Sequence, residues 1–324
     1  MNSILINIIF CLAGLAGLYF GGEKLVTGAV TTANKLNIRP QLVAITIVAL
    51  GTSLPELFVS VNAVNQGAQD IAWGNVVGSN ISNLFCVLGV AAIVSPLLIS
   101  SKSLKVEVFW VLFSCGVLVF SARMFSSISV LGGALLLILL LGIIFHVSIT
   151  ALKTRKNKTQ SDIDDSWKNS KIWISLLTIC FGALLLIGSA ELVVFSAKKI
   201  AEILVIPEAF IGLTIIALGT SLPEVAASIV AVKRGHSDIA LGNVIGSNIF
   251  NSLGIIGAAA IASGSQKFVA PENFVRFDIL VMLASTLILG VIFLYAKRIG
   301  RHVGAIFVCT YLVYVWIAFH QAQI

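Results

Sequence analysis

Charged side chains are scarce in this chain. Asp, Glu, Lys and Arg make up 11% of the 324 residues and hydrophobic residues 58%, whereas roughly a quarter of an ordinary soluble domain is charged. This scarcity excludes a pair of soluble domains, which the length alone would allow. The apolar residues instead form ten runs of the length that crosses a bilayer, which is about 20 residues. The runs cover residues 4–34, 41–65, 71–96, 106–122, 128–151, 172–200, 208–232, 239–263, 274–296 and 302–320.

Several other patterns are missing. The runs lack the alternation of polar and apolar residues that marks membrane β-strands of about ten residues, so we predict an all-α integral membrane fold with ten transmembrane helices. The cysteines lie singly within apolar runs and without a CxxC spacing, which predicts buried free thiols. The histidines are scattered, which disfavours a transition-metal site. The cysteines are Cys11, Cys86, Cys115, Cys180 and Cys309.

The formal net charge of +7 would suit a nucleic-acid partner, so the placement of the charges has to decide. Most Lys and Arg residues lie in one set of alternate loops between the runs, as Lys102, Lys105 and Arg298 do. Positively charged loops stay in the cytoplasm, which predicts that both termini lie outside. No stretch interleaves basic with aromatic residues for base stacking, and we expect no nucleic-acid partner.

One sequence pattern occurs twice. Residues 41–92 align with residues 209–260 without a gap, and more than half of the paired positions are identical. The shared core is ALGTSLPE, at Ala49–Glu56 and Ala217–Glu224. Chance similarity between apolar helices would match Leu, Ile and Val, but here Glu, Pro, Asp and Asn match as well. The chain therefore contains an internal repeat.

The repeat divides the chain into two halves with five runs each, residues 1–152 and 172–324. Because five is an odd number, the second copy enters the membrane from the opposite side. Inverted repeats with interrupted helices near mid-membrane are typical of secondary transporters, whose substrate site lies between the repeats. The polar residues 153–171 are predicted to be a short cytoplasmic linker within one membrane domain.

Each copy of the motif carries a glutamate. Glu56 lies near the middle of the second run and Glu224 near the middle of the seventh. A carboxylate at that depth is costly unless it faces protein, water or a cation, so it is a functional hypothesis by default. The alternative is a hydrogen-bonded structural glutamate. Two equivalent glutamates in identical polar surroundings favour function.

The helix that carries each glutamate is predicted to break just before it. Pro55 and Pro223 supply no backbone N–H and oppose the carbonyl four residues earlier, and Gly51 and Gly219 add backbone freedom. Broken backbone at membrane depth is tolerated only where it lines a cavity. We therefore expect freed carbonyl oxygens near the break. They are expected near Ala49, Thr52, Ala217 and Thr220.

Hydroxyl groups accompany the glutamates. Ser53 and Ser221 lie three residues before Glu56 and Glu224, on the same helix face. Carbonyl, hydroxyl and carboxylate oxygens form a hard ligand set that suits Ca²⁺ or Na⁺.

The run that follows each motif carries a polar trio at four-residue spacing, on one helix face. The trios are Asn75, Ser79 and Asn83, and Asn243, Ser247 and Asn251. We predict that Ser79, Asn83, Ser247 and Asn251 line the cavity. Close packing is expected for Asn75, Asn243 and the neighbouring Gly74, Gly78, Gly242 and Gly246. A polar seam that joins helices is the alternative for both trios.

Four further acids recur in the repeat. Asp70 and Asp238 begin the third and eighth runs, where capping of a helix N-terminus is the expected role and a cation-attracting vestibule is the alternative. Glu23 and Glu191 lie in the first and sixth runs. Gating or proton access is one hypothesis for them, and pairing with Lys24 or a neighbouring helix is another for Glu23.

With GTSLPE followed by GSNI-N, occurring twice, the sequence resembles the Ca²⁺:cation antiporter superfamily, and most closely the prokaryotic sodium/calcium exchangers. The resemblance implies that Glu56 and Glu224 bind Ca²⁺ and Na⁺ alternately, while a bundle of the first and sixth segments slides to switch access. It also implies two further sets of ligands. The carbonyl donors would be Ala49, Thr52, Ala217 and Thr220, and the hydroxyl ligands Ser53, Ser79, Ser221 and Ser247.

At one pair of equivalent positions the sequence departs from some relatives. Asn83 and Asn251 are both amides, whereas potassium-dependent relatives use an acid at such a position, so K⁺ co-transport is not expected. The site then holds two carboxylates, which can neutralise one Ca²⁺, two protons or most of the charge of three Na⁺. The charges alone leave Na⁺ and H⁺ open as counter-ion.

We therefore expect an antiporter of a prokaryotic plasma membrane that exchanges Na⁺ for Ca²⁺ by alternating access, with the 3:1 ratio that the resemblance implies. An H⁺/Ca²⁺ or other divalent-cation antiporter is the alternative. A passive channel fits less well, since filters are usually rings of equivalent groups. An enzyme is not expected, since no Ser–His, Cys–His or HExxH arrangement lies near Glu56 or Glu224. No cofactor is expected, and the partners are the two ions and the lipid bilayer.

Overall fold

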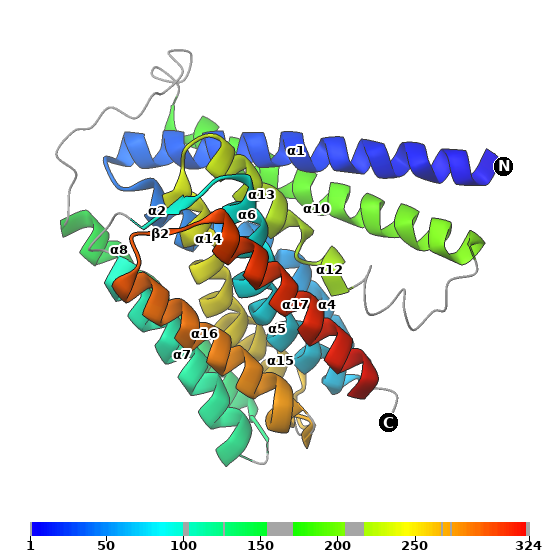
Figure 1. Cartoon of the computed structure of the whole chain (residues 1–324). Coiled ribbons are helices and arrows are strands. Elements are labelled where there is room, and N and C mark those ends of the chain that lie inside the picture. Colours follow the sequence, from blue (N-terminus) through cyan, green and yellow to red (C-terminus); the bar gives the residue numbers. More distant parts are fainter. Residues whose placement is uncertain are drawn as a thin grey trace.

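The computed structural model is almost entirely helical (Figure 1). The predicted linker lies, apart from its two end residues, outside the residues that the structure describes. So does the beginning of the seventh predicted segment. The described residues are 2–99, 104–125, 127–153, 171–204, 217–266, 268–272 and 274–321.

The first half of the chain runs from α1 to α8. Its elements are α1 (Asn2–Leu36), α2 (Pro40–Val43), the π-helical η1 (Ala44–Val48), α3 (Ala49–Thr52), α4 (Leu54–Asn65), α5 (Gln69–Ser82), the π-helical η2 (Asn83–Val87), α6 (Leu88–Val94), the strand β1 (Leu97–Leu98), α7 (Leu104–Met124) and α8 (Val130–Lys153).

The second half repeats much of this order. Its elements are α10 (Ile172–Ile203), α12 (Ala217–Gly219), α13 (Leu222–Lys233), α14 (Ser237–Ile249), the π-helical η4 (Phe250–Ile255), α15 (Ile256–Ala262), the π-helical η5 (Phe274–Asp278), α16 (Ile279–Tyr295), the strand β2 (Arg298–Ile299) and α17 (Arg301–Gln321).

Among the described residues, eight helices are long and apolar enough to cross a membrane, or nine with the bent pair Pro40–Thr52 and Leu54–Asn65. They match nine predicted runs to within a few residues, which confirms a helical membrane fold. Of the remaining run, 208–232, only residues 217–232 are described, in α12, α13 and the turn between them.

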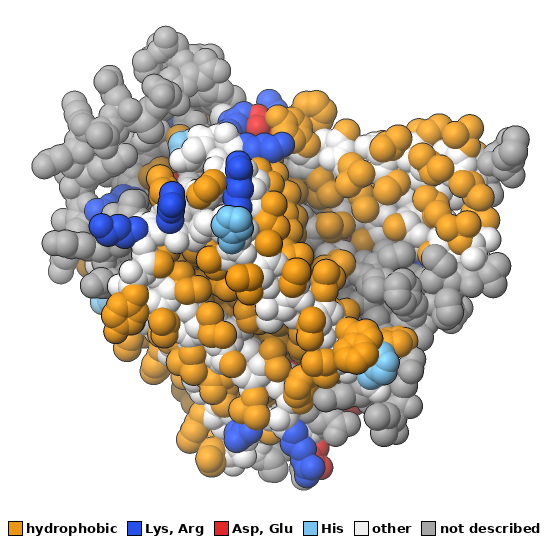
Figure 2. Space-filling model, viewed as in Figure 1, with side chains coloured by type: hydrophobic (Ala, Val, Ile, Leu, Met, Phe, Trp, Pro, Cys, Tyr) orange, Lys and Arg blue, Asp and Glu red, His pale blue; other side chains and the backbone are white. Residues whose placement is uncertain are grey.

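Two continuous helices form the centre of the molecule. In an apolar stretch of 18 residues from each helix, 78% of the residues are buried for Gln69–Val94 and 83% for Ser237–Ala262. The corresponding share for α1 is only 17%. The outer helices instead expose large apolar side chains, such as Leu135 and Leu141 on α8. Figure 2 shows apolar side chains over the middle of one face, with Lys and Arg toward its upper and lower edges. This is the surface that a bilayer solvates.

Helices α1 and α10 lie side by side across one end of the helical bundle (Figure 1). Their backbones approach closely: a Cβ atom added at Gly182 would lie 2.8 Å from the carbonyl oxygen of Gly21. Small residues at such crossings are the usual means of close helix packing in membranes. The two helices therefore pack as one unit, in which each belongs to a different half of the chain.

The predicted breaks in the motif helices are confirmed. The axes of the Pro40–Thr52 and Leu54–Asn65 helices differ by 43°, and Ser53 between them has φ −89° and ψ 8°. In the second half, Thr220 and Ser221 form a turn between α12 and α13. The π-helical segments η1, just before the first break, and η2 and η4, which follow α5 and α14, were not predicted from the sequence.

Close packing by glycine is confirmed in the second half. A Cβ atom at Gly246 would clash with the carbonyl oxygen of Ile45 and lie 2.7 Å from Ala49 Cβ, and one at Gly242 would lie 2.9 Å from Gln41 O. The α14 backbone therefore rests directly on the segment that leads to the first break. For Gly78, apart from its chain neighbours and the backbone of its own helix, no atom of the described residues lies within 4 Å of the corresponding position.

One short pairing accompanies the helices of the predicted all-α fold: β1 and β2 run antiparallel, Leu97 opposite Ile299. Two expectations need correction. The thiols are free, but Cys180 and Cys309 are exposed. Asp70 and Asp238 are not N-cap residues: Ala68 and His236 occupy those positions, after glycines at φ 77°. The two aspartates lie in the first turn instead, where the positive end of the helix dipole stabilises a negative charge.

Candidate cation site

The two motif glutamates occupy equivalent places. Each lies in the first turn of the helix that follows the break, directly after the proline. The N-terminus of a helix carries a partial positive charge and unpaired N–H groups, which favour a carboxylate. Glu56 is 1% exposed and Glu224 is fully buried. Both carboxylates are therefore held inside the protein, as the sequence predicts.

The two halves of the chain meet at these glutamates. Ser53, at the break of the first half, donates a hydrogen bond from Oγ to Glu224 Oε1 over 3.1 Å. The Thr52 hydroxyl also interacts with Glu224, and the two carboxylates interact electrostatically with each other. The glutamate of the second repeat, Glu224, therefore lies against the helix break of the first repeat.

Several buried oxygen atoms of the predicted ligands have no hydrogen-bond partner among the described residues. A buried polar atom that lacks a hydrogen bond is costly, and an oxygen cluster of this kind suits a cation. Within the described part of the chain, buried side-chain oxygens of predicted ligands without a hydrogen-bond partner are Glu56 Oε2, Glu224 Oε2, Ser221 Oγ, Ser247 Oγ, Asn83 Oδ1 and Asn251 Oδ1.

The carbonyl groups differ between the halves. Ala49 O still accepts the backbone N–H of Ser53 at 3.0 Å, because the missing N–H of Pro55 affects Gly51 rather than Ala49. Thr52 Oγ1 also lies 3.4 Å from Ala49 O, so a cation at the second lone pair of this carbonyl would share or displace that contact. In the second half Ser221 N–H bonds to Leu218 O at 3.2 Å. Thr220 is half-buried in that turn, and Ala217 begins α12.

Two asparagines for which only close packing is expected form hydrogen bonds to the motif segment of the first half. Asn243 Oδ1 accepts a hydrogen bond from Thr52 Oγ1 over 3.2 Å. Asn75 Nδ2 donates to the carbonyl oxygen of Glu56 over 3.0 Å and to Ser60 Oγ over 2.9 Å. Asn75 therefore fixes the first turn of α4, and Asn243 fixes the Thr52 hydroxyl. The sequence signal for these contacts is that Asn75 and Asn243 lie four residues before the predicted ligands Ser79 and Ser247, on the same helix face.

Glu23 pairs with a neighbouring helix. Its carboxylate forms a bidentate ion pair with Arg234, which follows α13; Arg234 Nε lies 2.9 Å from Glu23 Oε1, and Nη2 contacts Oε2. Arg234 Nη1 also donates to Thr27 Oγ1 over 2.5 Å. This confirms the pairing hypothesis for Glu23, with a partner at the end of α13 rather than with Lys24.

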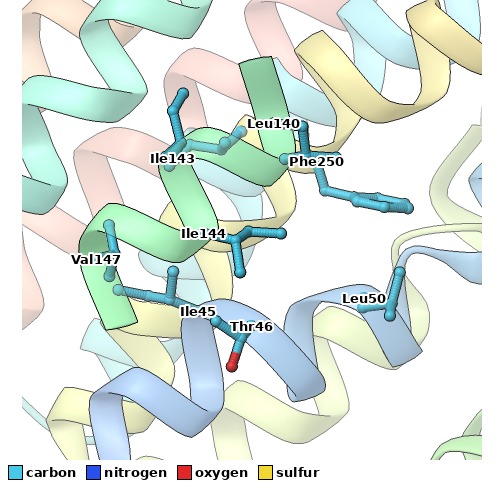
Figure 3. A pocket seen from close by; sticks show the side chains of 10 residues that line it. Ile45, Thr46, Leu50, Leu140, Ile143, Ile144, Val147 and Phe250 are labelled. Carbon is cyan, nitrogen blue, oxygen red and sulfur yellow. The ribbon is translucent and has the colours of Figure 1, made fainter. Parts of the chain in front are cut away.

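An apolar cavity of about 50 Å³ lies beside the first break (Figure 3). Residues of α8, the segment Ile45–Leu50 and Phe250 surround it, and Figure 3 shows Ile144 and Leu50 at its edge. Its polar side chain, Thr46, already donates to Leu42 O over 2.8 Å. The lining is almost entirely apolar and includes neither Glu56 nor Glu224, so this cavity is not a candidate for the cation site.

The comparison with known proteins gives one consistent result. A family model described as sodium/calcium exchanger protein matches residues 6–149 and 174–320. The putative antiporter CaxA of Alkalimonas amylolytica is 36% identical over 327 residues, 98% of this chain and 99% of that protein. The sodium/calcium exchanger MaX1 of Methanosarcina acetivorans is 31% identical over 351 residues, 98% of this chain and 99% of that protein.

The fold agrees with a solved exchanger. A structure of the sodium-calcium exchanger NCX_Mj, soaked with 10 mM Na⁺ and 10 mM Sr²⁺, matches with a TM-score of 0.80 and 31% identity. The match covers 96% of this chain and 97% of the other. This chain belongs to the sodium/calcium exchanger protein family. It is a multi-span membrane protein of a transporter family, and its relatives support antiport of Ca²⁺ against another cation.

Proposed function

We propose that this protein exchanges Na⁺ for Ca²⁺ across the plasma membrane of a prokaryote by alternating access, with three Na⁺ for each Ca²⁺. The observation that carries the proposal is the contact of Ser53 with Glu224 across the two repeats. Because Ser53 lies three residues before Glu56, this contact supports a single site that contains both carboxylates, each with one unpaired buried oxygen. One site cannot hold Ca²⁺ and its full Na⁺ load together, and this exclusion couples the two fluxes.

The proposed ligands surround that site. Glu56 and Glu224 supply the charge that both ions share, and neutral oxygens from both repeats complete the coordination. Carbonyl oxygens come from Ala49, Thr52, Ala217 and Thr220, hydroxyl groups from Ser53, Ser79, Ser221 and Ser247, and amide oxygens from Asn83 and Asn251.

With the proposed ratio of three Na⁺ for each Ca²⁺, the cycle is electrogenic. Two carboxylates neutralise one Ca²⁺, whereas three Na⁺ leave one net positive charge in the site. Two protons would also neutralise the pair, so H⁺/Ca²⁺ antiport is the second candidate, which the same two carboxylates support.

Reconstituted vesicles separate the two candidates. With Na⁺, K⁺ and H⁺ gradients imposed one at a time, we expect ⁴⁵Ca²⁺ uptake with the Na⁺ gradient alone. Clamping the pH on both sides should leave this uptake unchanged, and a membrane potential should alter its rate because the cycle moves charge. Uptake that follows the H⁺ gradient and ignores Na⁺ would overturn the Na⁺ assignment.

The proposed access switch is a movement of α1 and α10 across the other helices. In this proposal residues 1–152 and 172–324 form ten transmembrane segments as inverted repeats, with both termini outside and residues 153–171 in the cytoplasm. The close α1–α10 crossing at Gly21 and Gly182 supports movement of the two helices as one unit. Since α1 also packs on α13, a sliding α1 must break the contacts it makes there.

The Glu23–Arg234 ion pair is therefore expected to favour the access state seen here. Arg234→Gln removes the pair, which is partly exposed, and exposed pairs contribute up to about 1 kcal/mol, or roughly fivefold in an equilibrium. We expect the ratio of apparent Ca²⁺ affinities at the two membrane faces to shift by roughly two- to fivefold. Uptake into vesicles of known protein orientation measures it.

The repeat provides the matched control. Glu191 is equivalent to Glu23, but the residue equivalent to Arg234 is Gln66, which cannot form an ion pair. Glu191→Gln should leave the ratio unchanged. Equal shifts of this affinity ratio in Arg234→Gln and Glu191→Gln would contradict a specific effect of the Glu23–Arg234 ion pair on the access state.

A further inference from the structure

Four buried asparagines lie where α5 and η2 meet α14 and η4. Asn80 and Asn83 come from the first half, and Asn248 and Asn251 occupy the equivalent positions of the second. Each is at most 2% exposed. Asn83 and Asn251 are proposed ligands, whereas the sequence motifs assign no role to Asn80 or Asn248.

Asn248 fixes the orientation of the Asn83 amide. Asn83 Nδ2 donates to Asn248 Oδ1 over 3.0 Å, so the amide nitrogen of Asn83 is directed to Asn248 and its oxygen points elsewhere. That oxygen is buried and has no hydrogen-bond partner in the described part of the protein. Asn248 is itself held, because its Nδ2 donates to the backbone oxygen of Asn80 over 3.3 Å.

The equivalent bond in the other half is not made. Repeat symmetry would pair Asn251 Nδ2 with Asn80 Oδ1, yet both atoms are buried without a hydrogen-bond partner among the described residues. Asn80 Nδ2 instead donates to Ser252 Oγ over 2.9 Å and contacts Met282 Sδ at 3.4 Å. The residue equivalent to Ser252 is Leu84, which offers no acceptor. The sequence itself therefore makes the two amide pairs unequal.

We propose that Asn248 is a positioning residue of the cation site, which holds the Asn83 oxygen toward the ions, while Asn80 does not do so for Asn251. The proposal rests on the proposed function in one respect, that Asn83 is a ligand. A ligand held in place loses less freedom when the ion binds. Partners that orient metal ligands typically account for about 10- to 100-fold in metal affinity.

The test is a double-mutant cycle in reconstituted exchanger. Asn248→Ala is expected to raise the KM for Ca²⁺ by about 10- to 100-fold with little change in the maximal rate, and Asn83→Ala should do the same. If Asn248 acts through Asn83, the double variant should resemble Asn83→Ala alone, because the interaction is then already lost. Asn248→Leu, which keeps the side-chain volume, should match Asn248→Ala and separates orientation from packing.

Asn80 provides the repeat-matched control. The effects of Asn80→Ala and Asn251→Ala on KM should add, because the two side chains share no hydrogen bond. An unchanged KM in Asn248→Ala and Asn248→Leu, or additive effects of Asn248→Ala and Asn83→Ala, would overturn the proposal. So would equal coupling in the Asn80–Asn251 cycle.

A measurement of direct ⁴⁵Ca²⁺ binding to the purified protein tests the role of Asn248 independently of which counter-ion drives transport. Wild-type protein that binds ⁴⁵Ca²⁺ without Na⁺-driven uptake would contradict Na⁺ exchange and leave the asparagine test intact. Asn248 variants that bind ⁴⁵Ca²⁺ as tightly as wild type would overturn the asparagine proposal, whichever ion drives transport.

Discussion

Exchange is expected to stop in Glu56→Gln and in Glu224→Gln, while both variants stay folded. Each substitution removes one of two negative charges from a buried site and keeps the side-chain volume. Loss of one partner from a buried charged pair costs about 3–5 kcal/mol, so Ca²⁺ affinity should fall by on the order of 100-fold or more. Uptake of ⁴⁵Ca²⁺ into vesicles, with size-exclusion profiles of the purified variants, measures both properties.

The control for this pair is Glu272→Gln. Glu272 is 74% exposed and pairs with Arg276 one helical turn away, so its loss should leave uptake unchanged. The two site variants should also resemble each other, since Glu56 and Glu224 occupy equivalent places. Robust exchange in either variant would show that the ions do not share the pair.

A large loss of both stability and transport is expected from Gly246→Ala. The added Cβ would clash with Ile45 O and crowd Ala49 Cβ, so α14 must move away from η1 and α3. Overpacking of this kind typically costs about 1–3 kcal/mol. The same movement would pull Asn243 from Thr52, a contact of 3.2 Å. Thermal unfolding and ⁴⁵Ca²⁺ uptake should therefore change together.

Gly142→Ala is the matched control, because apart from its chain neighbours and the backbone of α8 no atom of the described residues lies within 4 Å of the Cβ position. It exchanges glycine for alanine in a membrane helix without a backbone contact. We expect wild-type unfolding and uptake. If Gly246→Ala behaves like Gly142→Ala, the close approach of α14 to the motif helix is not needed for the site.

The membrane segments could be predicted because an apolar run long enough to cross a bilayer rarely forms any structure other than a transmembrane helix. The break at Ser53 could also be predicted, since Pro55 removes a backbone donor whatever its surroundings. The π-helical segments could not, because an extra residue in one helical turn depends on packing rather than on local preference. The Asp70 prediction was wrong for a related reason: Gly67 turns the chain so that the N-cap is Ala68 and α5 begins two residues earlier.

The contacts that join the two halves were beyond reach of the sequence pattern. Ser53 and Glu224 are each marked by the motif, but only the fold brings them within 3.1 Å. Asn248 matches Asn80 in sequence, and their different bonds depend on Ser252 and Leu84 on other turns. Periodicity reports which face a residue shares within one helix, and it carries no information on which faces of two helices meet.

The most direct test of the shared site is competition between Na⁺ and Ca²⁺ for the purified protein. Bound ⁴⁵Ca²⁺ would be measured at rising Na⁺, with choline replacing Na⁺ to hold ionic strength constant. If Glu56 and Glu224 serve both ions, Na⁺ should displace all bound Ca²⁺, with a Hill coefficient above one because several Na⁺ replace one Ca²⁺. Ca²⁺ that stays bound at saturating Na⁺ would contradict the shared site.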